Sequence, residues 1–193
     1  MGLSSVIVKL KKLFVHALNL LFFKQKVSSK RRKGESPASV AFIRDFVMIP
    51  QLKASSKEDA IDKMILAIQQ KYPTCLHDVA QVKADVMRRE ASMPTGLDHG
   101  IAVPHGRTNA VTQILGSVAL VDNSENENGA ISDWETIDHS RIQIIVLTLV
   151  PEDAQRPYLQ IMAFITHLLH RDSDDLLLCK TAREMARFFD KSI

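Results

Sequence analysis

The sequence predicts a single α/β domain of three layers, with a β-sheet between helices, preceded by a basic extension. Helical and strand periodicity alternate from about residue 44 onward, and no internal repeat is visible. Segments 114–121 and 142–150 are rich in Val, Ile and Leu on both faces, which is typical of interior strands that helices cover on each side. A chain of 193 residues that is 46% hydrophobic also has enough apolar surface for a full core.

Charge is distributed unevenly between the extension and the domain. Residues 1–36 hold nine basic residues and one acidic residue, a net charge of +8, whereas 16 basic and 21 acidic residues give the rest of the chain −5. The pI of about 8.9 therefore describes the extension, and we expect no nucleic-acid binding by the domain. Cys75 and Cys179 form neither a metal-binding nor a disulfide spacing, which fits a reducing cytoplasm.

The extension combines an amphipathic segment with a charged linker. In residues 6–23, Lys9, Lys12 and His16 share one helical stripe, and most apolar side chains lie on the other. The longest uncharged run, residues 13–23, has 11 residues, whereas a spanning helix needs about 20, so we expect no membrane crossing. Residues 24–36 are predicted to be a solvated linker. Attachment of residues 1–33 to an anionic membrane surface and loose packing on the domain or on a partner are both open interpretations.

The first half of the domain is predicted to contain a strand, two helices and a second strand. Residues 46–49 form an edge strand that stops at Pro50. Ser56 and Asp59 form a capping pair that opens a helix, which ends near residue 72 because a proline follows. A second helix spans residues 78–90, where valines recur at helical spacing, and a short apolar strand follows at 100–103.

The second half begins with the two interior strands, at 114–121 and 142–150. A polar loop without periodicity, residues 122–133, connects them. Helices are predicted at 158–170 and 181–189, and the second opens with a capping box formed by Thr181 and Glu184. The chain thus divides into an extension, residues 1–36, and a domain, residues 44–191.

The stretch "TGLDHGIAVPHGR", residues 95–107, carries the candidate chemistry. His105 follows the short strand 100–103, and ligand sites in open α/β sheets collect outside the carboxyl ends of strands. A neutral imidazole is a nucleophile when its other nitrogen is held by a hydrogen bond. Gly106 lets the backbone approach a ligand and Arg107 supplies several donors, a combination that suits phosphoryl transfer. The alternative for His105 is an ordinary surface histidine in a turn.

A longer segment, "RREASMPTGLDHGIAVPHGR", resembles the signature of the enzyme IIA domain of the bacterial sugar phosphotransferase system, in its fructose/mannitol branch, which includes the nitrogen-regulatory IIA proteins. "SKEDAIDKMI", "DWETID" and "VLTLVPED" resemble further parts of that family, so the resemblance runs from about residue 44 to residue 189. It implies a mixed β-sheet with helices on both faces. We expect no cofactor and no metal. The resemblance also implies that His105 accepts a phosphoryl group from the phosphocarrier protein HPr, with Arg89, Thr95 and Arg107 near that group.

The sequence departs from the family pattern at Tyr158, where the family has a second histidine facing the active one. A tyrosine donates a hydrogen bond but carries no positive charge at neutral pH. Losing one charge-assisted hydrogen bond costs about 1.5–3 kcal/mol. We therefore expect weaker stabilisation of a phosphoryl group on His105, or none.

Two functions follow from this resemblance. In the first, the protein is a phosphotransferase with a phosphohistidine intermediate, acting in the cytoplasm or at the inner face of the membrane. Phosphorylated by HPr, it acts as a nitrogen-regulatory type of regulator on a partner protein or donates to a sugar-transport IIB component. In the second, it is a degenerate IIA-like module that binds a regulated partner without transferring phosphate. His167 and His170 could hold a metal with Asp172 or Asp174, although a solvated helix face is the simpler interpretation.

Overall fold

The computed structural model describes residues 38–122, 131 and 133–192. The predicted extension at 1–36 and most of the polar loop at 122–133 lie outside these residues. The elements, in chain order, are the 3₁₀ helix η1 (Ala38–Asp45), β1 (Val47–Leu52), α2 (Lys57–Lys71), α3 (Val79–Ser92), β2 (Ile101–Ala102), β3 (His105–Thr108), β4 (Leu115–Val121), β5 (Ile144–Pro151), α4 (Gln155–Leu177) and α5 (Ala182–Ser192).

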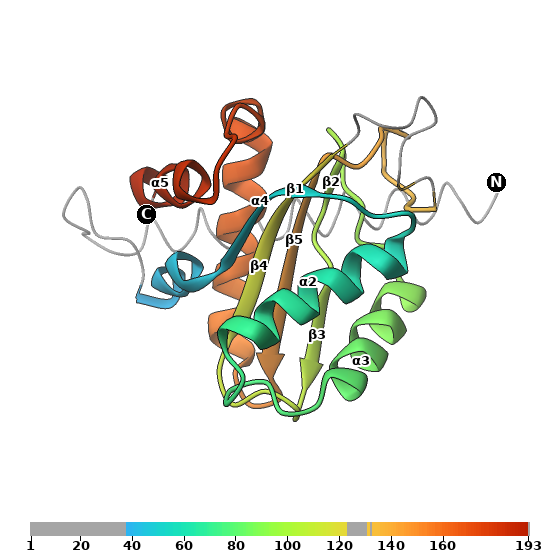
Figure 1. Ribbon diagram of the computed structural model, residues 1–193, viewed down its shortest axis with the longest axis vertical. Helices are drawn as coiled ribbons and strands as arrows, with labels where there is room; N and C mark the ends of the chain where they lie inside the picture. The colour runs from blue at the N-terminus through green and yellow to red at the C-terminus, as the bar shows by residue number, and fades with distance from the viewer. Residues whose placement is uncertain (1–37, 123–130, 132, 193) are drawn as a thin grey trace.

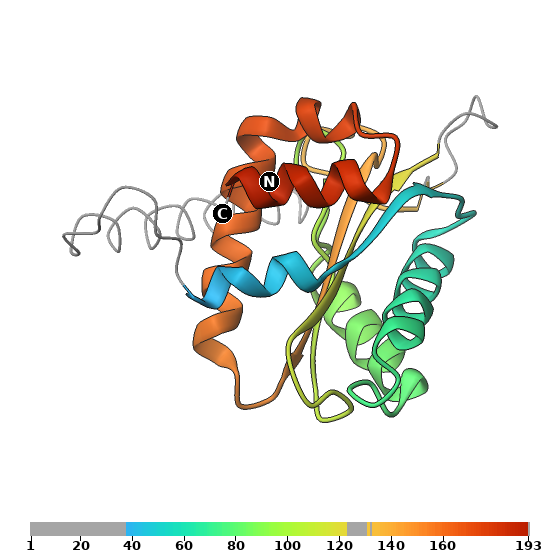
Figure 2. The ribbon, with the colours of Figure 1, turned by 60° about the vertical axis from the view of Figure 1, so that its left-hand side comes forward.

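A mixed β-sheet lies between two layers of helices, as predicted. Its strands follow the order β1, β4, β5 and then β2 and β3, which both pair with β5. The β4–β5 pair is antiparallel, whereas β1 is parallel to β4, and β2 and β3 are parallel to β5. Helices α2 and α3 cover one face, and η1, α4 and α5 cover the other, so each face has its own hydrophobic core (Figures 1 and 2). The interior positions predicted for 114–121 and 142–150 are confirmed by β4 and β5.

One edge of the sheet is a strand interrupted at Val103 and Pro104. Ile101 pairs with Ile144 and His105 with Thr148, so β2 and β3 keep the same register along β5. The prediction that the strand leaves the sheet after residue 103 is therefore wrong, because His105 begins β3. Proline has no N–H to donate to β5, but the Pro104 carbonyl still accepts from the Thr148 N–H at 3.1 Å, and the strand resumes directly after it.

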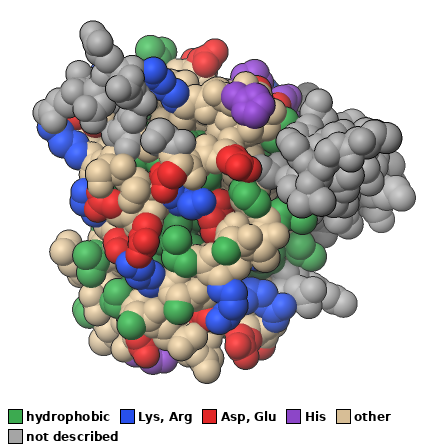
Figure 3. Space-filling model, turned by 90° about the vertical axis from the view of Figure 1, so that its right-hand side faces the viewer, with side chains coloured by type: hydrophobic (Ala, Val, Ile, Leu, Met, Phe, Trp, Pro, Cys, Tyr) green, Lys and Arg blue, Asp and Glu red, His purple; other side chains and the backbone are tan. Residues whose placement is uncertain are grey.

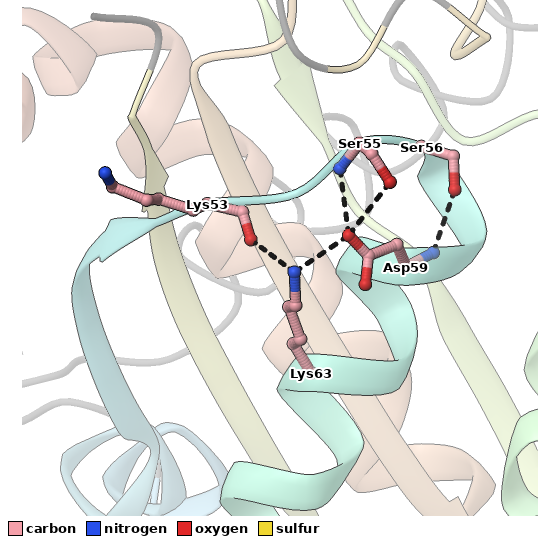
Figure 4. A network of polar contacts seen from close by, with 5 residues as sticks. All are labelled: Lys53, Ser55, Ser56, Asp59 and Lys63. Atoms are coloured by element: carbon pink, nitrogen blue, oxygen red, sulfur yellow. Dashed lines mark hydrogen bonds and ion pairs between the residues drawn. The ribbon is translucent and has the colours of Figure 1, made fainter. Parts of the chain in front are cut away.

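Helix α2 begins with a capping network that also ties it to the end of β1 (Figure 4). Ser56 Oγ accepts a hydrogen bond from the Asp59 backbone N–H at 3.1 Å, which confirms the predicted cap. The Asp59 carboxylate accepts from the Ser55 N–H at 2.9 Å, one residue earlier than in an ideal capping box. Lys63 Nζ bonds both Asp59, at 2.8 Å, and the Lys53 carbonyl, at 2.7 Å.

The two C-terminal helices are longer than predicted. Helix α4 starts at residue 155 because a proline at position 157 falls in the first turn, where the helix needs no N–H. It continues past residue 170 to Leu177, with a kink at Asp172 (φ −127°, ψ 22°). The capping box of α5 is confirmed, since Thr181 Oγ1 accepts from the Glu184 N–H and the Glu184 carboxylate accepts from the Thr181 N–H. Among the helices of the described residues, none is both long enough and apolar enough to pass through a lipid bilayer.

Helix α3 lies directly against β3, and Gly106 makes this approach possible. A Cβ atom at Gly106 would lie 2.8 Å from Val86 Cγ2 and 3.3 Å from Val86 N, closer than packed atoms allow. Any side chain at this position would therefore push α3 away from the sheet edge.

We expect Gly106→Ala to lower the free energy of unfolding by about 1–3 kcal/mol, the usual cost of overpacking. The measurement is urea unfolding of Gly106→Ala, Val86→Ala and the double variant. Val86→Ala removes the atom nearest to the new methyl group, so the double variant should cost less than the sum of the single changes. Strict additivity would contradict the close contact.

Candidate functional site

A cleft of about 480 Å³ opens where α3, β3 and the first turn of α4 meet. This is the edge of the sheet at which β3 and β5 end side by side (Figure 1). Figure 3 shows the face of the domain next to this edge, where Lys and Arg side chains gather in the lower part. The residues that line the cleft are Asp85, Arg88, Arg89, Ser92, His105, Arg107, Tyr158 and Leu159.

His105 is buried in this cleft with its tautomer fixed. Its Nδ1 lies 3.0 Å from the Val103 carbonyl oxygen, which only accepts, so Nδ1 carries the proton and Nε2 keeps its lone pair. The residue as a whole is only 7% exposed to solvent. The pKa of His105 is lowered to about 4, mainly by burial and in smaller part by the Arg89 charge, while the bond to Val103 acts in the opposite direction. At neutral pH the ring is therefore an uncharged nucleophile.

Tyr158, from the first turn of α4, faces His105. The two ring centroids are 5.3 Å apart, with an angle of 44° between the planes. Burial raises the pKa of Tyr158 to about 12, although the charges of Arg89 and Arg107 act against this shift. The phenol is therefore a neutral hydrogen-bond donor next to the imidazole at any physiological pH.

Arg89 reaches the cleft from α3 and Arg107 from β3, and each is anchored by a backbone carbonyl. Arg89 Nη1 donates to Met93 O at 2.8 Å, just beyond the end of α3. Arg107 Nη2 donates to Glu152 O, in the turn between β5 and α4. Each anchor uses one of the several donors of a guanidinium, so the remaining donors and the full charge stay available to an anion.

Asp85 is a cleft residue that the sequence did not single out. Burial alone would raise its pKa, but hydrogen bonds from Gln81, Thr108 and Arg88 outweigh burial and keep the pKa below its usual value. The carboxylate thus stays ionised, and it holds the Arg88 guanidinium at the rim. The spacing of Gln81, Asp85 and Arg88 on one helical face was a signal for this cluster.

Thr95 is buried behind the strand that carries His105. Its hydroxyl donates to Glu90 Oε2 at 2.6 Å and its N–H donates to Glu90 Oε1 at 3.0 Å, while its carbonyl accepts from Val103 N at 3.2 Å. Trp134 Nε1 also donates to Glu90, at 2.8 Å, so a fully buried carboxylate collects three bonds. Thr95 therefore supports the segment that holds Val103, and it does not appear among the residues that line the cleft.

The structure brings Arg89, His105, Arg107 and Tyr158 together around one cavity, and Gly106 lies in the wall behind them. Thr95 stands apart from this set. Besides Asp85, the cleft includes Arg88, Ser92 and Leu159, none of which was predicted from the sequence as a site residue.

The fold and this histidine cleft define the class to which the chain belongs. Residues 41–192 match the family "Phosphoenolpyruvate-dependent sugar phosphotransferase system, EIIA 2". The chain belongs to this family, as a IIA domain of the fructose/mannitol type.

Its relatives include regulatory and transport proteins. A "Nitrogen regulatory protein" of Bradyrhizobium diazoefficiens is 28% identical over 137 residues, which cover 71% of this chain and 82% of that protein. A "PTS system fructose-specific EIIABC component" of Bacillus subtilis is 26% identical over 63% of this chain, but the match covers only 18% of that protein.

Solved structures share the fold. The nitrogen regulatory protein IIA-Ntr from Neisseria meningitidis aligns with a TM-score of 0.63 at 21% identity, covering 76% of this chain and 94% of that chain. The IIA chain in a complex of enzyme IIAMtl with phosphorylated enzyme IIBMtl from Escherichia coli aligns with a TM-score of 0.58 at 17% identity, covering 81% and 98%.

We expect Glu90→Gln to lower the free energy of unfolding by about 1–3 kcal/mol, because an amide nitrogen cannot accept one of the three bonds that the carboxylate accepts. Trp134 is the only tryptophan in the chain, so its fluorescence reports the loss of its bond to Glu90 during urea unfolding. Glu135→Gln, at an exposed neighbour, is the control. Equal stability of the two variants would contradict the buried network.

The buried neutral state of His105 predicts a pH dependence of stability. The unfolded chain takes up a proton on this residue near its ordinary pKa of 6.5, whereas the folded chain does so near 4, so stability falls as pH falls between these values. The loss is roughly 3 kcal/mol by pH 4. Urea unfolding of the unchanged protein and of His105→Gln, from pH 7 to pH 4, should show a steeper decline in the unchanged protein. Parallel curves would mean that His105 titrates normally in the folded state.

Proposed function

We propose that the protein is a phosphorelay component whose acceptor atom is Nε2 of His105, with phospho-HPr as the donor. The observation that carries the proposal is the fixed tautomer of His105 in an arginine-lined cleft. The Val103 carbonyl holds Nδ1–H, which leaves Nε2 as the nucleophilic nitrogen. Its low pKa means that no proton has to leave before attack.

In this reaction the Nε2 lone pair forms a bond to phosphorus while the bond from phosphorus to the donor breaks. The imidazole becomes positively charged, and the Nδ1–H bond to the Val103 carbonyl stabilises that charge. Negative charge on the transferred oxygens is matched by Arg89 and Arg107. The first turn of α4, which contributes Tyr158, adds the partial positive charge of a helix N-terminus.

This role has two versions, which differ in what happens after His105 is phosphorylated: the protein regulates a partner, or it passes the phosphoryl group to a IIB component. Two of the relatives are named nitrogen regulatory proteins, and in both the match to this chain covers most of the relative's own length. Two sugar-transport relatives named EIIABC components match over only 18% and 13% of their own length, and a fructose-specific EIIA component of Haloferax volcanii matches over 56%. This favours a regulator that acts on a separate partner protein in the cytoplasm, with donation to a IIB component as the other version.

Tyr158 supports a second candidate function, a IIA-like module that binds a partner without transferring phosphate. The phenol offers a hydrogen bond but no charge at the position where the family pattern has a histidine. Binding would then use the same cleft, with Leu159 as an exposed apolar contact at its rim.

Phosphorylation can be tested with enzyme I, HPr and phosphoenolpyruvate, followed by intact mass measurement under alkaline conditions. We expect one added phosphoryl group on the unchanged protein and none on His105→Ala. His99→Ala is the matched control and should be phosphorylated normally, since it removes a histidine six residues away from a different cluster.

Tyr158 variants distinguish the two candidate functions. If His105 is the acceptor, Tyr158→Phe should slow phosphorylation about tenfold, the effect of one lost hydrogen bond. No added mass on the unchanged protein while HPr is charged, together with none on Tyr158→His, would reject phosphoryl transfer in favour of the binding module.

A further inference from the structure

A second group of ionisable side chains lies at the other end of the edge strand. The ligand atoms of Asp98, His99 and His170 all lie within 4.8 Å of one another. His170 Nδ1 is 4.0 Å from Asp98 Oδ1, and the rings of His99 and His170 are 5.7 Å apart. Figure 3 shows His side chains gathered near the top of the face, away from the Lys and Arg side chains in its lower part. The sequence suggested His170 as a metal ligand with His167, but the fold places it with residues 98 and 99 instead.

The turn that presents Asp98 and His99 is held in an unusual conformation. His99 has φ of 58° and Gly100 has φ of 68°, the left-handed region that a histidine rarely adopts. Two side chains of the 138–140 segment keep it there: Asp138 accepts from His99 N–H at 2.9 Å, and Ser140 Oγ accepts from Gly100 N–H at 2.6 Å. The turn is therefore ordered independently of any ligand, with the His99 ring directed toward His170 on α4.

We propose that Asp98, His99 and His170 form a binding site for a divalent transition-metal ion of the zinc class. Two imidazole nitrogens and one carboxylate oxygen form a donor set that suits Zn²⁺, whereas Ca²⁺ and Mg²⁺ prefer oxygen alone. Metal–ligand distances of about 2.0–2.2 Å place neighbouring ligands about 3.3 Å apart. The observed spacing of 4.0 Å between His170 Nδ1 and Asp98 Oδ1 closes with a small rotation of exposed side chains.

Three ligands leave the fourth tetrahedral position to water, since the cluster faces solvent: Asp98 is half-buried, and both histidines are exposed. The ligands come from two segments, the turn before β2 and the middle of α4. A bound ion would therefore join the element that leads to His105 to the helix that carries Tyr158. Twelve residues separate Tyr158 from His170, which is about 18 Å along the helix, so the ion would not enter the phosphoryl cleft.

The test is isothermal titration of the full chain, without a histidine tag, with Zn²⁺ as the probe. We expect one ion per chain, and His99→Ala and His170→Ala should each weaken binding at least tenfold. His167→Ala is the matched control, because it removes a histidine one turn earlier on the same helix that is not part of the cluster. His105→Ala is the second control, because it removes the cleft histidine; both controls should bind zinc with unchanged affinity.

Histidine ring NMR signals during the same titration identify the ligands directly. Zinc-induced shifts confined to His99 and His170 are expected. Zinc binding that disappears in His105→Ala would assign the ion to the cleft and overturn the proposal. So would unaltered binding by both ligand variants, or no binding to a folded chain at millimolar zinc. Circular dichroism of each variant establishes that it is folded, so a loss of binding reports the site itself.

Discussion

The hydrogen bond between His105 Nδ1 and the Val103 carbonyl is the interaction on which the site depends. It joins two residues on either side of Pro104, where the edge strand is interrupted. The Val103 backbone faces away from β5, since its N–H donates to the Thr95 carbonyl, and its own carbonyl is therefore available to the ring. The bond fixes which nitrogen carries the proton, and burial lowers the pKa so far that the ring takes up no second proton at neutral pH.

The remaining features of the cleft follow from how closely α3 approaches this strand. The Cα of Gly106 faces Val86 of α3 so closely that no side chain fits between them. The last turns of α3 therefore lie against β3. That contact brings Arg88 and Arg89 to the same cavity as Arg107. The ionised Asp85 offsets part of their charge and holds Arg88 at the rim. The cleft therefore concentrates positive charge around a neutral nucleophile, which suits an anionic reactant.

Local signals in the sequence predicted most of the helices and strands. The features that were not predicted depend on contacts between segments that are far apart in the chain. The caps at Ser56 and Thr181 and the apolar segments of β4 and β5 are visible in a short window, and the structure confirms them. The strand resumes at His105 because it pairs with β5, more than 40 residues further along the chain. A short stretch of sequence around Pro104 carries no information about that partner. The helical spacing around Asp85 indicates its local partners, but its place in the cleft depends on β3, which carries its partner Thr108 and against which α3 packs. The Thr95 position, inferred from a motif alone, lies behind the cleft because Glu90 and Val103 hold it there.

Tyr158 stands where the resemblance implies a histidine, and that difference would act on another stage of the proposed reaction from the one that His105 controls. A histidine buried at this position would also be neutral before a phosphoryl group arrives, since burial and the nearby arginines disfavour its charged form as they do for His105. Before transfer, therefore, a tyrosine and a histidine each offer one uncharged donor, and the readiness of Nε2 is the same. The difference arises once the phosphoryl dianion is in the cleft, because a histidine can then take up a proton and a tyrosine cannot. In the proposed reaction, Tyr158 would therefore act on how long the phosphorylated state persists, and persistence matters most for a protein whose phosphorylation state is itself the signal.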